Sequence, residues 1–144
     1  SFVLTGPEDD FFRAHKLHSL SNVFFLGKKE VRQLPAYIHA YDICINPQMV
    51  NSLTDGNYPL KIDEYLAMGK PTVATSTDTM RSVFAAHTHL AANREEWIEA
   101  TDKAVSEIKD TALANERIAF AKTHSWGHSV NKIYEIIANY SAKQ

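Results

Sequence analysis

The chain has 144 residues, enough for one domain of ordinary size and too few for two. Hydrophobic residues make up 44% and charged residues 22%, values typical of globular proteins, which excludes a disordered or collagen-like chain. Lys and Arg number 15 and Asp and Glu 17, a net charge of −2 that argues against a protein that coats nucleic acid, because phosphate binding needs a basic excess.

The cysteine count and the hydropathy pattern indicate the cellular compartment of the protein. A single cysteine, Cys44, rules out an intramolecular disulfide and suits a reducing compartment. No apolar run approaches the roughly 18–20 residues of a membrane span. We therefore expect a cytoplasmic protein, with peripheral attachment to a membrane as an option for a longer form. The chain enters a strand pattern at Phe2 without a signal sequence, so we expect it to be part of something longer.

Short apolar runs alternate with helical patterns along the chain. The runs predict strands at 2–4, 23–26, 43–45 and 71–75, and a weaker one at 87–92. Helical spacing predicts helices at 9–20, from about 35 onward, at 59–68, within 76–86, and at 94–109, 112–123 and 125–140. This order favours a Rossmann-like α/β fold: a three-layer sandwich whose parallel sheet has about five to six strands, in a single domain over residues 1–144.

The longest loop of this predicted fold follows the third strand. Ligands of open parallel sheets bind beyond the carboxyl ends of the strands, and long loops in compact domains are often functional. The loop runs for about ten residues after Pro47 and ends in Asp55-Gly56-Asn57-Tyr58-Pro59. Gly56 and Asn57 tolerate a positive φ, and Pro59 fixes the first turn of the next helix.

The start of that helix has the features of an anion site. The backbone N–H groups of Leu60, Lys61 and Ile62 would point out of the helix end, an arrangement suited to phosphate. Lys61 adds a full positive charge in the same turn. Glu64, three residues on, could accept hydrogen bonds from two sugar hydroxyls. The alternative is that Pro59 only starts a helix and that Lys61 and Glu64 form a solvated pair.

Three stretches, in register, carry a resemblance to a known family. They are Asn22–Gly27 with Leu34–Tyr37 and Tyr41–Ile45; the block Asn57–Thr75, which reads NYPLKIDEYLAMGKPTVAT; and His124-Ser125-Trp126. Together they resemble the C-terminal half of a GT-B glycosyltransferase, close to the family-4 retaining enzymes. The middle block is the most specific of the three.

The resemblance implies a donor-binding domain that helps to move a sugar from a nucleoside-diphosphate sugar to an unknown acceptor. It places the diphosphate at the helix start, with Lys61 as a candidate stabiliser of the leaving group, and the ribose hydroxyls at Glu64. The full set of nucleotide-sugar-binding residues that we expect is Gly6, Pro7, Gly27, Lys28, Asn57, Tyr58, Pro59, Leu60, Lys61 and Glu64. We expect neither a metal nor a further cofactor.

The chain also departs from the family pattern. Many members carry a second glutamate, eight residues before the first, that holds the donor sugar; here that position is Gly56, with Asp55 beside it. The N-terminal acceptor domain of the family has no counterpart in this chain. We therefore expect an acceptor domain as a partner, and we expect the chain by itself to fold without transferring sugar.

Two alternative functions remain open on the sequence. A nucleotide-sugar epimerase of GT-B architecture would bind the same nucleotide without transfer. A non-catalytic α/β interaction module of the receiver type would need an acidic pair after its first strand and an aspartate after its third. Thr5-Gly6-Pro7 and Asn46-Pro47 stand there instead.

The histidines and tryptophans invite other interpretations. His124 and His128 have helical i, i+4 spacing, but zinc needs further ligands, so surface or capping roles are favoured for the seven histidines. Ser125 fits a helix N-cap better than a nucleophile. Trp97 and Trp126 fit packing better than base stacking.

The last predicted helix has a wide apolar stripe. Its members are Val130, Ile133, Tyr134, Ile137 and Tyr140. We expect residues from about 126 onward either to fray or to self-associate with a neighbouring copy, because exposed apolar surface recruits a partner. The alternative is that the helix folds back on its own sheet.

Overall fold

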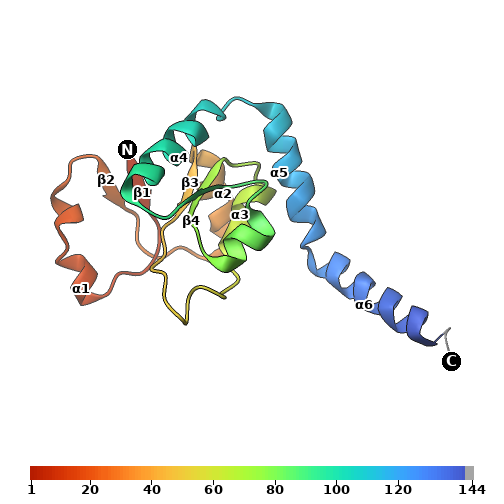
Figure 1. The fold of residues 1–144 in the computed structure, drawn as a ribbon. Coiled ribbons are helices and arrows are strands. Elements are labelled where there is room, and N and C mark those ends of the chain that lie inside the picture. The colour runs from red at the N-terminus through yellow and green to blue at the C-terminus, as the bar shows by residue number, and fades with distance from the viewer. Residues whose placement is uncertain (142–144) are drawn as a thin grey trace. The chain divides into compact units, whose positions relative to one another are not determined.

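The computed structural model describes residues 1–141 and shows an α/β chain whose strands are all parallel, as predicted. The chain divides into two compact units, residues 1–37 and the remainder from residue 38 onward. Figure 1 traces the elements of both units along the chain.

The first unit is a parallel strand pair with short helical turns between its strands. Its elements are β1 (Phe2–Leu4), α1 (Asp10–Arg13), the 3-10 turn η1 (Lys16–Ser19) and β2 (Val23–Phe25). Phe2 lies opposite Val23 in the strand ladder. Asp9 caps α1 by accepting a hydrogen bond from the backbone N–H of Phe12 at 2.7 Å.

The predicted helix over 9–20 is wrong in its length. His15 adopts an extended backbone between α1 and η1, and its Nδ1 accepts a hydrogen bond from the N–H of Leu17 at 3.3 Å. A side chain that bonds to a nearby backbone group offers the chain an alternative to the continuous helix. The apolar spacing therefore produces two short turns.

Helix α2 follows a 3-10 turn, as the position of Pro35 predicts. The turn η2 is Val31–Gln33, and α2 is Leu34–Ala40. Pro35 is the second residue of α2, where its missing N–H costs no helical hydrogen bond. Ile38, in the second half of α2, is buried.

The second unit is built on a three-stranded parallel sheet. Its strands are β3 (Cys44–Asn46), β4 (Thr72–Thr75) and β5 (His89–Ala91), in the order β3-β4-β5. Its helical elements are α3 (Leu60–Ala67), the π-helical turn η3 (Met80–Phe84), α4 (Arg94–Ser106), α5 (Thr111–Thr123) and α6 (Trp126–Ser141). The weakly signalled fifth strand is thus confirmed.

Hydrophobic cores cover both faces of this sheet. Neighbouring residues of β4 point to opposite faces, because side chains alternate along a strand. Ala74 therefore joins the core of α3 and α5, and Val73 joins that of α4. The first core consists of Ile62, Leu66, Ala74, Met80, Phe84 and Ala121, and the second of Val73, Ala91, Ala100 and Ala104. Helices α3 and α5 lie side by side in Figure 1. The predicted three layers are present in this unit.

The sheet differs from the prediction in one respect. The number of strands agrees with the expected five to six, but they form one sheet of two strands and one of three. Each strand has only three or four residues, so few backbone hydrogen bonds are available to extend a ladder. Phe2 of β1 is 51% exposed, although it belongs to an apolar run.

Cys44 lies in the core of the second unit. Its side chain is buried in β3, and burial raises the pKa of the thiol to about 12. In the part of the chain that the structure describes, no helix combines the length and the apolar character needed to cross a membrane.

Helix α6 has no buried residue. The packing role predicted for Trp126 is wrong, since this side chain is 87% exposed, whereas Trp97 packs on the second core as predicted. All five residues of the predicted stripe on α6 are exposed, so the helix does not fold back on its own sheet. Ser125 is the N-cap, since its Oγ accepts a hydrogen bond from the N–H of His128 at 3.3 Å.

Candidate functional site

The predicted site residues of the first unit lie at the ends of its two strands. The N–H of Gly6, after β1, donates to the carbonyl oxygen of Gly27, after β2, at 3.1 Å. Gly27 has a φ of +66°, a conformation that favours glycine, and no heavy atom lies within 4 Å of a Cβ placed there. The two glycines predicted to line the site are therefore adjacent. Pro7 and Lys28 are exposed beside them.

A carboxylate and an imidazole that sequence reasoning missed also follow β1. Glu8 Oε2 lies 2.9 Å from His18 Nε2, and the His18 ring stacks on Phe25 with centroids 3.8 Å apart. Lys29 places its ammonium 5.4 Å from the centre of the Tyr37 ring, a cation–π contact. The basic residue left exposed after β2 is thus Lys28.

The long loop of the second unit is held by side-chain hydrogen bonds from its own polar residues. The Gln48 N–H donates to Thr75 Oγ1 at 2.8 Å, and the Gln48 side chain donates to the carbonyl oxygen of Thr54 at 2.9 Å. Asp55 Oδ1 accepts from the N–H of Asp78 at 2.8 Å. The loops after β3 and β4 are thereby tied together.

The loop end does not use the conformational freedom of its glycine and asparagine. Neither Gly56 nor Asn57 has a positive φ, since within residues 1–141 this conformation occurs only at Gly27 and Gly69. The N–H of Asn57 instead donates to Thr54 at 3.2 Å, which closes a turn with an ordinary backbone.

Helix α3 begins one residue after the predicted start. Pro59 is its N-cap, and the carbonyl of Pro59 accepts from the N–H of Ile62 at 2.8 Å. The predicted anion donor Ile62 is therefore already bonded. The N–H groups of Leu60 and Lys61 have no acceptor among the described residues, as expected for the first turn of a helix.

The two charged side chains predicted to bind the ligand are available to do so. Lys61 and Glu64 are both exposed, and in residues 1–141 neither takes part in an ion pair. They are three residues apart on α3 and so share one side of the helix. The alternative of a solvated Lys61–Glu64 pair is not what the structure contains.

The far end of α3 carries structural residues rather than ligand-binding ones. Gly69 has a φ of +71° and ends the helix, with the N–H of Lys70 donating to the carbonyl of Tyr65 at 3.0 Å. Lys70 Nζ donates to the carbonyl oxygens of His39 and Tyr41, at 2.7 and 2.6 Å. The lysine of the Gly-Lys-Pro segment therefore caps the end of α2.

A polar cluster lies beside the start of α3 that the sequence did not reveal. Tyr58 Oη donates to Asp63 Oδ2 at 2.7 Å, and His124 Nδ1 lies 2.7 Å from Asp63 Oδ1. The contact between His124 and Asp63 spans 61 positions of the chain, so no local pattern could have shown it. Of the two histidines with zinc-like spacing, His124 is thus engaged by a carboxylate.

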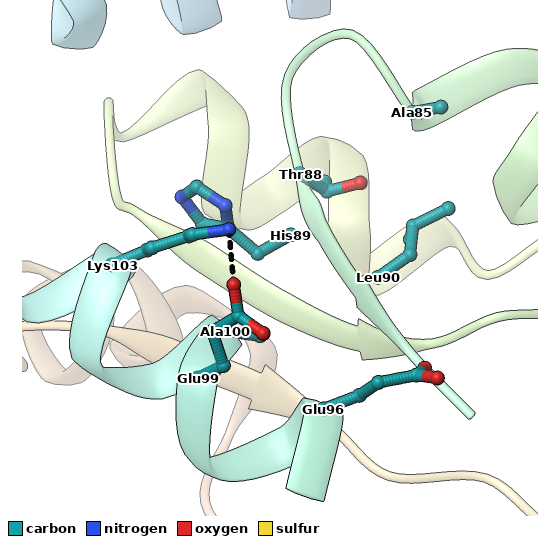
Figure 2. Close-up of a pocket in the computed structure, with 8 residues that line it drawn as sticks. All are labelled: Ala85, Thr88, His89, Leu90, Glu96, Glu99, Ala100 and Lys103. Carbon is teal, nitrogen blue, oxygen red and sulfur yellow. Dashed lines mark ion pairs between the residues drawn. The ribbon is translucent and has the colours of Figure 1, made fainter. Parts of the chain in front are cut away.

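A pocket of about 350 Å³ lies between β5 and α4 of the second unit, and Figure 2 shows the residues that line it. Glu99 and Lys103 on α4 form an ion pair at 2.7 Å, which lowers the pKa of the exposed Glu99 carboxyl. His89 of β5 pairs with Glu107 at 3.0 Å. None of the predicted site residues lines this pocket.

The potential metal ligands in the described part of the chain are not clustered. Among residues 1–141, no three His, Cys, Asp or Glu side chains come together as a metal site would require. The exposed polar groups at the start of α3 are instead a lysine, a glutamate and two backbone N–H groups, which suit an anion and hydroxyl groups.

Comparison with known proteins bears on the family of this chain. A protein of Bacillus subtilis (strain 168) is 28% identical to this chain over 151 residues; its name, TuaH, carries a provisional assignment as a teichuronic acid biosynthesis glycosyltransferase. The alignment covers the whole of this chain and 36% of that relative, so the chain spans about a third of its length. The family model of the glycosyl transferases group 1 matches residues 1–108, which include both sets of predicted site residues. The chain belongs to the glycosyl transferases group 1 family.

Proposed function

We propose that this chain is the donor-binding part of a glycosyltransferase that uses a nucleoside-diphosphate sugar. The observation that carries the proposal is the start of α3, where the N–H groups of Leu60 and Lys61 and the Lys61 side chain have no partner among the described residues. This turn lies inside the region matched by the family model. In our proposal the diphosphate binds there and the ribose hydroxyls bind Glu64.

The chemistry follows from charge development at the leaving group. When the bond between the sugar and the diphosphate breaks, negative charge grows on the departing phosphate oxygens. A helix N-terminus and a lysine fixed beside those oxygens stabilise that charge without having to reorient. Lys61 is the residue we assign to this role, and we propose that the reaction needs no metal ion. Addition of a chelator to the full-length enzyme should then leave the rate of transfer unchanged.

The finer assignment is to the C-terminal half of a GT-B enzyme of the retaining, family-4 type. It is supported by the block Asn57–Thr75 and by the relative's greater length, which leaves room for a separate acceptor domain. The lone buried Cys44 is compatible with the cytoplasmic location that we propose. The 144-residue chain alone should bind donor and transfer no sugar, and transfer above a control without protein would contradict this.

Thermal denaturation with a panel of nucleotides tests the proposal. Uridine or guanosine diphosphate should raise the denaturation temperature, because a ligand present at about 100 times its Kd stabilises the native state by about 2.7 kcal/mol. The base that stabilises most identifies the donor class. If no nucleoside diphosphate has an effect at millimolar concentration, the chain is not a donor-binding domain.

A further inference from the structure

The first turn of α3 contains a carboxylate as well as the proposed anion site. Asp63 belongs to the same turn as Lys61, but the two lie about 200° apart around the helix axis, on either side of the buried Ile62. A negative charge near a helix N-terminus weakens the attraction of that end for another anion. The site therefore needs something to hold the Asp63 carboxylate away from it.

Both oxygens of the Asp63 carboxylate are engaged. An ionised carboxylate only accepts hydrogen bonds, so the two groups within 2.7 Å of its oxygens must both be donors. Tyr58 donates its hydroxyl proton to Oδ2, and His124 donates from Nδ1 to Oδ1. Burial, and after it the hydrogen bond to the Asp63 carboxylate, raises the pKa of the Tyr58 hydroxyl, which keeps that proton in place.

The imidazole of His124 is itself fixed by aromatic rings. Phe120 and Phe84 pack edge-on against it, with ring centroids 4.5 and 5.7 Å away. His124 also ends α5, since its N–H donates to the carbonyl of Ala121 at 3.1 Å. The donor that reaches Asp63 thus belongs to the residue that ends α5, and its Nδ1 also lies 3.1 Å from Tyr58 Oη in the loop before α3.

We infer that His124 is a positioning residue for the anion site at the start of α3, an inference that rests on the proposed function. It holds the Asp63 carboxylate on the side of α3 that faces α5 and draws its charge into two hydrogen bonds. The opposite side, with Lys61 and Glu64, then remains free for the diphosphate and the ribose. Through Tyr58, the same carboxylate fixes the residue that leads into Pro59.

Two substitutions of His124 distinguish the loss of its Nδ1 hydrogen-bond donor from the loss of its ring. In His124→Asn the amide nitrogen can occupy the place of Nδ1, whereas the amide of His124→Gln reaches only the place of Nε2. We expect His124→Gln to weaken binding of inorganic pyrophosphate to the full-length protein about fivefold, the size of one charge near a helix end. His124→Asn should bind within about twofold of the parent.

A second substitution tests the proposed role of the charge. If His124→Gln acts by releasing the Asp63 carboxylate, then adding Asp63→Asn should restore pyrophosphate binding to within about twofold of the parent. A purely structural role predicts the reverse, because removal of a second partner would lower binding and stability further. His87→Ala is the matched control. The His87 ring also packs on Phe120, with ring centroids 4.2 Å apart, but His87 has no hydrogen bond to Asp63.

Isothermal titration calorimetry of each variant decides the outcome. The inference is overturned if His124→Gln binds pyrophosphate like the parent or like His87→Ala, or if the double variant binds no better than His124→Gln. In those cases a weakened Lys61→Ala variant would still support the proposed function. If the parent binds neither pyrophosphate nor a nucleoside diphosphate, the proposed function fails, and the inference fails with it.

Discussion

Helices α3 and α6 both carry apolar residues at helical spacing, yet they lie in very different surroundings. Ile62 and Leu66 of α3 are completely buried, whereas Ile133 of α6 is 57% exposed and no residue of α6 is buried. The difference comes from what each helix meets. An apolar stripe shows that one face of a helix can be buried, but whether it is buried depends on which other elements pack against it.

Other elements pack tightly against the apolar face of α3. It packs on β4 and on α5, and a Cβ placed at Gly69 would come within 3.2 Å of Ala114 Cβ on α5. The glycine that ends α3 thus also permits α5 to approach. Helix α6 continues from α5 and leads away from the rest of its unit in Figure 1. Lys61 and Glu64, to which we assign contacts with the diphosphate and the ribose, lie on the helix that packs on two other elements.

The largest effect should come from truncating a buried residue of α3. Leu66→Ala is expected to lower the free energy of unfolding by about 2–5 kcal/mol, because it leaves a cavity in a core that packs from several sides. Ile133→Ala on α6 should change it by no more than about 0.5 kcal/mol, as expected for an exposed position. Urea denaturation measures both.

Equal destabilisation by the two variants would break the comparison, since it would mean that α6 is as well covered as α3. The measurement should be made at low protein concentration, so that association through α6 does not contribute to the stability of the parent.

The second effect concerns charge at the two helices. Lys61→Ala should weaken binding of a nucleoside diphosphate by about 1–3 kcal/mol, the range for a charge-assisted hydrogen bond. The matched control is Lys132→Ala on α6, which removes the same charge from an exposed helix and should leave affinity unchanged. Calorimetric titration with uridine and guanosine diphosphates gives both values. Equal affinities of the two variants would place the diphosphate elsewhere.

The third effect separates ribose from phosphate. Glu64→Gln removes the charge of the acceptor assigned to the ribose hydroxyls and should weaken nucleoside diphosphate binding by about 1 kcal/mol. Binding of inorganic pyrophosphate should remain nearly as in the parent, since it has no ribose. Glu135→Gln on α6 is the control. A parallel loss for both ligands would show that Glu64 acts on the helix end and not on a sugar.

The contrast between the helices also explains how much could be predicted. The order of elements, the buried strand of Cys44 and the end of α3 at Gly69 follow from local apolar runs and from glycine, which the sequence displays directly. The hydrogen bond from His124 to Asp63 could not be predicted, because it joins residues far apart in the chain.

The misjudged details have the same origin. Trp126 looked like a packing residue because large aromatic side chains usually are, but nothing in the sequence says which surface would cover it. The extended backbone of His15 ended α1 early through a side-chain hydrogen bond that apolar spacing does not encode. The roles of Gly6, Lys28, Lys61 and Glu64 in ligand binding remain predictions.

The smallest effect is expected along α6 itself, where the exposed apolar side chains are Trp126, Val130, Ile133, Tyr134, Ile136, Ile137 and Tyr140. An uncovered helix of 16 residues is marginal in water, so its amides should open far more readily than those of β4. Hydrogen exchange at low protein concentration should show weak protection over 126–140. Protection should then rise with concentration, because self-association covers the stripe. Strong protection over 126–140, equal to that of β4 and independent of concentration, would mean that α6 is covered within a single molecule, and would remove the contrast with α3.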